Sequence, residues 1–84
     1  MTYSIDILRS AQKQLGQINR QDQSRIISAI QALGDDPRPQ GYRKLSGRPA
    51  WRIRIGSYRV IYEIHDSQLL VLIVAVGHRR EIYR

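Results

Sequence analysis

Residues 51–65 carry the pattern that most restricts how this chain can fold. The segment WRIRIGSYRVIYEIH alternates apolar and polar side chains on both sides of Gly56-Ser57. This alternation is typical of a β-hairpin with that dipeptide at its tip. Symmetric pairing about the tip puts two arginines, Arg54 and Arg59, directly opposite each other.

Alternation assigns the hairpin side chains to two faces. One face is apolar and holds Trp51, Ile53, Ile55, Tyr58, Val60, Tyr62 and Ile64. The other face holds Arg52, Arg54, Arg59, Ile61, Glu63 and His65. Like charges directly opposite on a sheet are destabilising, on the order of 0.2–1 kcal/mol. Because a small domain has little stability to spare, this arginine-rich face indicates a function.

The rest of the chain predicts two helices and two more strands. Residues 3–8 predict a first strand, and residues 68–76 (QLLVLIVAV), apolar on both faces, predict an interior strand. Helical spacing of apolar residues predicts two amphipathic helices between the first strand and the hairpin. These apolar residues are Ala11, Leu15 and Ile18, and then Ile26, Ile27, Ile30 and Leu33. Gly34 suits the end of the second helix, and residues 35–50 predict a loop.

These elements predict one α+β domain over residues 1–84, in the order β-α-α-β-β-β. Two N-terminal helices pack on one face of a small twisted, mainly antiparallel sheet. Alternation places Leu70, Leu72 and Val74 on the arginine side of that sheet. We expect the end of the chain or another protein to cover them, because small domains seldom expose such a patch without use.

Charge is concentrated in the middle of the chain. The net charge is +7, with seven basic and no acidic residues in residues 37–62 and a balance on either side. A concentrated positive field favours a polyanionic partner such as nucleic acid. The chain has no cysteine and no long apolar run, which predicts a cytoplasmic protein without disulfides, thiolate metal sites or membrane association.

The last residues, VGHRREIYR, supply candidates for chemistry. Gly77 permits a bend that would bring His78, Arg79 and Tyr83 over the hairpin arginines. In a helical turn, Arg79 and Tyr83 would share a face. The predicted result is a cationic groove with one imidazole and one phenol.

Such a groove suits metal-free cleavage of RNA. The ribose 2′-hydroxyl attacks the adjacent phosphorus, which requires a base, an acid and positive charge around the phosphorane. Arg59 and Arg79 would supply that charge. Arginine stays protonated, so His78 is the better proton carrier, with Glu63 as another candidate base. No metal or cofactor is expected.

The remaining candidates would bind RNA. Tyr83 could stack on a base or donate a hydrogen bond. Four cations would contact the RNA itself, and the two in the loop would read phosphate charge rather than sequence. They are Lys44, Arg48, Arg52 and Arg54.

Three segments together resemble the RelE family of the RelE/ParE toxin-antitoxin superfamily. They are KLSG, WRIRIGSYRVIYEI and LLVLIVAVGHRREIYR. The resemblance implies a toxin that is a ribosome-dependent messenger RNA endonuclease and cleaves the codon in the decoding site. It also implies a cognate antitoxin, which binds operator DNA within the toxin-antitoxin complex.

The resemblance assigns roles by position. Arg52 and Arg54 match two basic active-site positions, and Arg59 matches the phosphate-stabilising arginine. Arg79 matches the arginine after the V-G-x motif, and Tyr83 matches the substrate-orienting tyrosine. Well-known members carry lysine at the first two positions, so the departure here favours His78 over a lysine base.

Alternatives remain open on the sequence alone. A ParE-like poison of DNA gyrase has the same fold and cuts no RNA, and it needs no basic groove with histidine and tyrosine. A plain RNA-binding or ribosome-associated module would need the hairpin arginines only. The sequence stops at Arg84, immediately after Tyr83. We therefore expect an antitoxin to inhibit by covering the groove or by excluding the toxin from the ribosome, rather than by displacing a long terminal helix.

Overall fold

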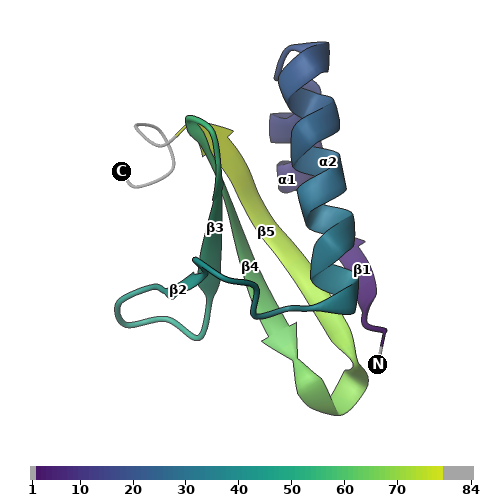
Figure 1. Ribbon diagram of the computed structural model, residues 1–84, viewed down its shortest axis with the longest axis vertical. Coiled ribbons are helices and arrows are strands. Elements are labelled where there is room, and N and C mark those ends of the chain that lie inside the picture. The colour runs from purple at the N-terminus through teal and green to yellow at the C-terminus, as the bar shows by residue number, and fades with distance from the viewer. Residues whose placement is uncertain (1, 79–84) are drawn as a thin grey trace.

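The computed structural model describes residues 2–78, which form two α-helices and a five-stranded sheet (Figure 1). In chain order the elements are β1 (Ser4–Ile7), α1 (Arg9–Gly16), α2 (Arg20–Asp35), β2 (Arg43–Lys44), β3 (Trp51–Ile55), β4 (Tyr58–His65), a 3-10 helix (Asp66–Gln68) and β5 (Leu70–His78). The predicted α+β architecture is confirmed. The structure adds β2, a two-residue strand in the segment predicted to be a loop.

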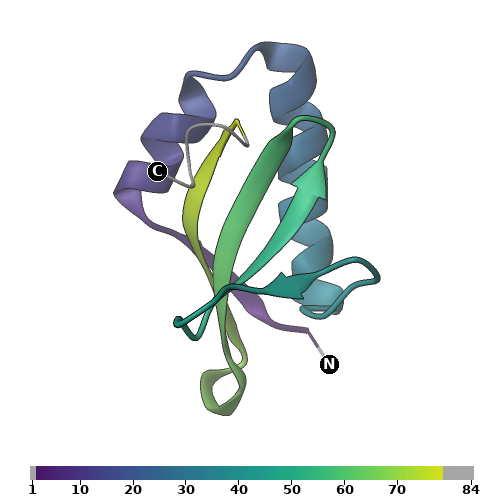
Figure 2. The ribbon, with the colours of Figure 1, turned by 90° about the vertical axis from the view of Figure 1, so that its left-hand side faces the viewer.

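The strands lie in the order β1-β5-β4-β3-β2. β1 is parallel to β5, and every other neighbouring pair is antiparallel. Both helices cover one face of the sheet, and Figure 2 shows the opposite face turned toward the viewer. We call that opposite face the far face. Neither described helix is long and apolar enough to cross a membrane.

The hairpin of β3 and β4 has the predicted register. Arg54 lies opposite Arg59, Ile53 opposite Val60, and the remaining pairs continue in step. Val60 is fully buried toward the helices, which places the arginines on the far face as predicted. The hairpin tip is tight, and Gly56 adopts a positive φ of 60° there, a conformation that favours glycine.

The core lies between the helices and the near side of β3, β4 and β5. Its buried members are Ala11, Leu15, Ile26, Ile30, Leu33, Ile53, Val60, Tyr62, Val71, Ile73 and Val76. The predicted apolar stripes of both helices face this layer except at Ile27, which is exposed on α2. α2 begins at a well-formed cap, because the Asn19 side chain accepts a 2.9 Å hydrogen bond from the Asp22 backbone N–H.

A β-bulge interrupts the pairing of β4 with β5. Ile61 pairs with Ala75 and the next residue, Tyr62, pairs with Ile73, so Val74 is an extra residue on β5. The residues of β5 that enter the core are accordingly Val71, Ile73 and Val76. Beyond the bulge the alternation of β5 is therefore shifted by one residue, which simple counting along the sequence did not anticipate.

Gly34 does not end its helix, contrary to the prediction. α2 continues through Asp35, and Asp36 is the residue that caps it. Gly34 instead lies where the chain before β1 passes close to the helix. The Tyr3 backbone N–H donates a 2.7 Å hydrogen bond to the Gly34 carbonyl, and a Cβ at Gly34 would lie 3.0 Å from the Tyr3 carbonyl oxygen.

Two contacts hold the segment between α2 and β2. The buried Tyr62 hydroxyl donates a 2.7 Å hydrogen bond to the Pro37 carbonyl oxygen, and burial raises the pKa of Tyr62. Arg38 binds Asp66 with a 2.8 Å ion pair, and Asp66 also accepts a hydrogen bond from Tyr3. The Arg38 hydrogen bond, followed by that of Tyr3, lowers the pKa of the Asp66 carboxyl group.

Candidate functional site

Four arginines from three neighbouring strands lie on the far face. Arg54 of β3 lies opposite Arg59 of β4, and Arg52 of β3 lies opposite Arg43 of β2. Directly opposed residues in an antiparallel pair project to the same face. We call Arg43, Arg52, Arg54 and Arg59 the arginine ladder. The sequence analysis missed Arg43 as a member, because nothing in the loop composition predicted that β2 pairs there.

The members of the arginine ladder differ in exposure. Arg54 is exposed and Arg59 is half-buried, whereas Arg52 is only 8% exposed. A charged side chain that is held away from water keeps less of its hydration, so its field acts more strongly on a neighbouring anion. The ladder thus combines buried and exposed cations, which suits close contact with a phosphate backbone.

The far face is polarised along the strands. At the end of the sheet that carries the hairpin tip, this face holds the arginine ladder. The small residues Ala75 and Gly77 of β5 lie beside it, paired with residues of β4. Beyond the bulge the next row contains acidic residues, with Glu63 opposite Leu72 and Leu72 opposite Asp6. A polyanion would therefore be attracted to the hairpin end of this face and repelled from the other end.

Glu63 lies in the acidic part of the far face. Its carboxylate contacts His65 on the same strand, with 2.9 Å between Glu63 Oε1 and His65 Nε2. Along β4 it is separated from Arg59 by Ile61, which is buried on the same face. Glu63 thus faces the predicted side of the sheet, but it is paired with a histidine at a distance from the ladder.

Leu70 and Leu72 lie on the far face, as alternation predicts. They pair with His65 and Glu63 and are partly exposed. Val74, the third residue of the predicted patch, is the extra residue of the bulge and is also partly exposed. The end of the chain that was expected to cover this patch lies outside the described residues.

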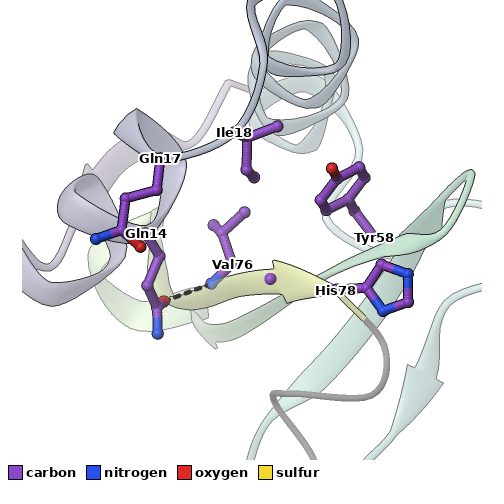
Figure 3. A pocket seen from close by; sticks show the side chains of 7 residues that line it. Gln14, Gln17, Ile18, Tyr58, Val76 and His78 are labelled. Carbon is purple, nitrogen blue, oxygen red and sulfur yellow. Dashed lines mark hydrogen bonds between the residues drawn. The ribbon is translucent and has the colours of Figure 1, made fainter.

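His78 lies on the face opposite to the one predicted. It pairs directly with Tyr58, and the two rings meet edge to face with centroids 6.0 Å apart and an interplanar angle of 79° (Figure 3). Tyr58 packs against the core on the helix side of the sheet. The bulge explains the difference, because the shifted alternation puts Gly77, not His78, beside Arg59.

Two further predicted residues, Arg79 and Tyr83, lie outside the described residues. Their convergence with the arginine ladder stays a prediction. The residues that the structure does bring together on one face are Arg52, Arg54 and Arg59, joined by Arg43.

The loop cations take different positions. Lys44 pairs with Trp51 and so lies on the helix side of β2. Its Nζ donates hydrogen bonds to the carbonyl oxygens of Arg48 at 3.0 Å and Leu45 at 3.3 Å, which close the loop between β2 and β3. Arg48 is exposed at that loop. The geometry thus gives Lys44 a structural part in addition to the predicted phosphate contact.

Comparison with known proteins gives the family. Residues 5–83 match the family model described as ParE toxin of type II toxin-antitoxin system, parDE. The chain is also 33% identical over 92 aligned residues to Toxin RelG of Mycobacterium tuberculosis (strain ATCC 25618 / H37Rv), covering 100% of this chain and 99% of the relative. The chain is a RelE-family toxin of the RelE/ParE superfamily. It is accordingly a toxin of a type II toxin-antitoxin system.

Solved structures have the same fold as this toxin. The toxin-antitoxin complex RelBE2 of Mycobacterium tuberculosis matches with a TM-score of 0.83 and 23% identity, over 94% of this chain and 100% of that chain. The archaeal RelE-RelB complex of Pyrococcus horikoshii OT3 matches with a TM-score of 0.84 and 26% identity, over 96% and 99%. These matches show that the toxin shares its fold with both proteins over nearly its whole length.

The described part of the toxin offers no cluster for a metal ion. Within residues 2–78, no group of three or more His, Cys, Asp or Glu side chains could hold one. The side chains that gather on the far face of the hairpin are guanidinium groups, which bind phosphate oxygens through paired N–H donors. Guanidinium groups gathered in this way are suited to recognition and electrostatic stabilisation of a phosphate.

Proposed function

We propose that this toxin is an endoribonuclease that cuts messenger RNA in the decoding site of the ribosome and so inhibits translation. The observation that carries the proposal is the arginine ladder. Its cations come from three neighbouring strands and project to one face, so the sheet gathers them on one surface before a phosphate arrives. Preorganised donors of this kind stabilise charge that develops in a transition state.

The chemistry is attack of the ribose 2′-hydroxyl on the adjacent phosphorus. The 2′-hydroxyl gives its proton to a base as its oxygen bonds to phosphorus, and the phosphorane gains negative charge on its oxygens. The P–O5′ bond then breaks, and the 5′-oxygen takes up a proton as it leaves. Arg59, supported by Arg52 and Arg54, binds the phosphorane oxygens. Arg79 and Tyr83 complete the site in this proposal, with Arg79 adding charge and Tyr83 orienting the substrate. Guanidinium charge supports this reaction without a metal ion.

Proton transfer is assigned to His78, whose position differs from the predicted one. The ring lies at the end of β5 on the helix side, so it would have to act around that end of the sheet. A His78→Gln variant tests the assignment. Loss of cleavage with the folded state retained supports it, whereas an unchanged cleavage rate removes His78 from the mechanism.

An antitoxin partner follows from the same comparisons. The matching structures of Mycobacterium tuberculosis and Pyrococcus horikoshii are complexes of toxin and antitoxin. We infer that the cognate antitoxin of this toxin covers the far face, where Leu70 and Leu72 are partly exposed and the arginine ladder attracts acidic side chains. Operator DNA would be bound through the antitoxin.

Expression in a bacterial host tests the function. The wild-type toxin and an Arg59→Ala variant are induced, growth is followed, and 5′ ends are mapped on a message with and without its start codon. Arg9→Ala is the matched control, because Arg9 is an exposed arginine at the start of α1. We expect cuts only in the translated message, a loss of about a hundredfold or more in Arg59→Ala, and no loss in the control.

A second candidate is a ParE-like poison of DNA gyrase. It is favoured by the description of the matching family model, which names a ParE toxin. In the same experiment it predicts growth arrest with intact messages and blocked replication. Arrest that needs the ladder but not His78 or Tyr83, with no cuts, would instead indicate an RNA-binding module.

A further inference from the structure

A cavity lies on the helix side of the sheet, at the same end as the arginine ladder (Figure 3). Its volume is about 470 Å³, within the range of small-molecule sites in proteins. It is lined by Gln14, Gln17, Ile18, Tyr58, Val76, Gly77 and His78. We call it the α1 cavity, because α1 and the residues just after it form one wall.

The walls of the α1 cavity differ in chemistry. Two rings, Tyr58 from β4 and His78 from β5, stand on one side, and the amides of Gln14 and Gln17 stand on the other (Figure 3). Val76 and Ile18 supply apolar surface between them. A flat heterocycle with hydrogen-bonding edges fits such walls, because one ring can stack on its face while the other, nearly perpendicular ring meets its edge. The amides can pair with its polar edge.

One wall is already held in place. β1 pairs with β5 only from Leu70 to Ile73, and beyond that the Gln14 side chain takes the position of a neighbouring strand. Gln14 Oε1 accepts a 2.8 Å hydrogen bond from the Val76 backbone N–H. Because the oxygen is engaged in this way, the Gln14 amide nitrogen remains as a donor. Gln17 is exposed and can turn either end of its amide to a ligand.

The α1 cavity adjoins the proposed phosphate site. Gly77 lines the cavity and is also the residue that pairs with Arg59 on the far face. A phosphate bound at Arg59 and a ligand in the cavity would therefore lie on the two sides of one strand, at its end. The net positive charge of this region favours a ligand that is attached to a phosphate.

We propose that the α1 cavity binds a nucleobase of the RNA strand whose phosphate is held by the arginine ladder. The base stacks on the Tyr58 ring, meets the nearly perpendicular His78 ring at its edge, and pairs with Gln14 and Gln17. This inference rests on the proposed function and extends it. It assigns the toxin's preference for the nucleotide next to the cleaved bond to a cavity on the helix side of the sheet. A planar side chain of a protein partner is the competing occupant.

Titration of the 15N-labelled full chain tests the proposal directly. The probes are adenosine 5′-monophosphate, uridine 5′-monophosphate and ribose 5-phosphate, which has the sugar and phosphate but no base. We expect the two nucleotides to shift the Val76 backbone amide and the side-chain amides of Gln14 and Gln17. Ribose 5-phosphate should shift only the neighbours of Arg59. Equal shifts from all three probes would overturn the proposal.

Variants separate stacking from folding. Tyr58→Leu should weaken nucleotide binding about tenfold, the usual order of the loss of one ring–base contact, while Tyr58→Phe keeps the ring and the affinity. Gln17→Leu should change the ratio of the adenosine to the uridine affinity. The matched control is Gln21→Leu, which makes the same change at an exposed position of α2. An unchanged ratio in Gln17→Leu, or binding of N-acetyltyrosinamide in place of nucleotides, contradicts the proposal.

Failure of this proposal can be told apart from failure of the proposed function. If wild-type toxin cuts translated messages but Gln17→Leu cuts the same sites at the same rates, the base pocket is wrong and the nuclease stands. If no message is cut, the nuclease is wrong, and the titration still decides whether the α1 cavity takes a base.

Discussion

Replacing Tyr62 by phenylalanine removes one hydroxyl group from the centre of the toxin. Tyr62 is 0% exposed, and its hydroxyl donates a 2.7 Å hydrogen bond to the carbonyl oxygen of Pro37. Pro37 is also a buried residue. The ring of the variant preserves the packing, so the change isolates the hydrogen bond. A buried carbonyl left without its partner costs about 1–3 kcal/mol.

We therefore expect the free energy of unfolding of Tyr62→Phe to fall by about 2 kcal/mol. That is a large share of the roughly 4–13 kcal/mol expected for a domain of this length. Each kcal/mol lowers the melting temperature of a small domain by about 4–8 °C. The melting temperature of the variant should accordingly fall by roughly 10 °C.

Urea unfolding, followed by circular dichroism, measures the difference. The slope with denaturant should stay constant, because the variant exposes the same surface on unfolding. Tyr58→Phe is the matched control, since Tyr58 is only half-buried, and it should lose less than about 0.5 kcal/mol. Equal losses in the two variants would refute the reasoning, because the Pro37 carbonyl would then be satisfied without Tyr62.

The same variant tests the effect of pH. Burial raises the pKa of Tyr62 in the folded toxin, while in the unfolded chain it titrates near its ordinary value of about 10. The stability contributed by the neutral hydroxyl is fully present below about pH 10 and is lost as the pH rises above it. Wild-type toxin should therefore lose stability above about pH 10 more steeply than Tyr62→Phe, which unfolding curves at graded pH would measure.

Three other predictions concern single contacts. Gly34→Ala should lower the free energy of unfolding by about 1 kcal/mol despite its better helix propensity, because the new Cβ crowds a backbone carbonyl; an increase measured in urea would contradict the close approach. Asp66→Asn should make the free energy of unfolding less sensitive to acid, because Arg38 lowers the pKa of Asp66 in the folded toxin. The stability that the Asp66 carboxylate contributes is present above its unfolded pKa of about 4 and is lost as the pH falls through its folded pKa. Acid unfolding curves that run parallel in wild type and variant would argue against this reasoning. In Gln14→Leu the backbone amide hydrogen of Val76 should exchange with solvent about tenfold faster, because it has lost its acceptor. An unchanged exchange rate would show that Gln14 does not protect this edge of β5.

Much of the fold follows from local patterns. Alternation on both sides of a two-residue tip determines the register of a hairpin, so the opposition of Arg54 and Arg59 could be predicted from the sequence. The helix stripes and the interior strand were predictable for the same reason. In each case the side chains that share a face are set by the period of one segment, without knowledge of its partner.

The tertiary structure decided the contents of the site. The bulge at Val74 depends on how β5 fits against β4, and it moves His78 from the predicted groove to the helix side. Arg43 joins the arginine ladder only because β2 pairs with β3. Gly34 lies where a chain segment about thirty residues away in sequence passes close to the helix. Such features arise from contacts between segments that are distant in sequence. The side-chain periodicity within one segment therefore cannot predict them.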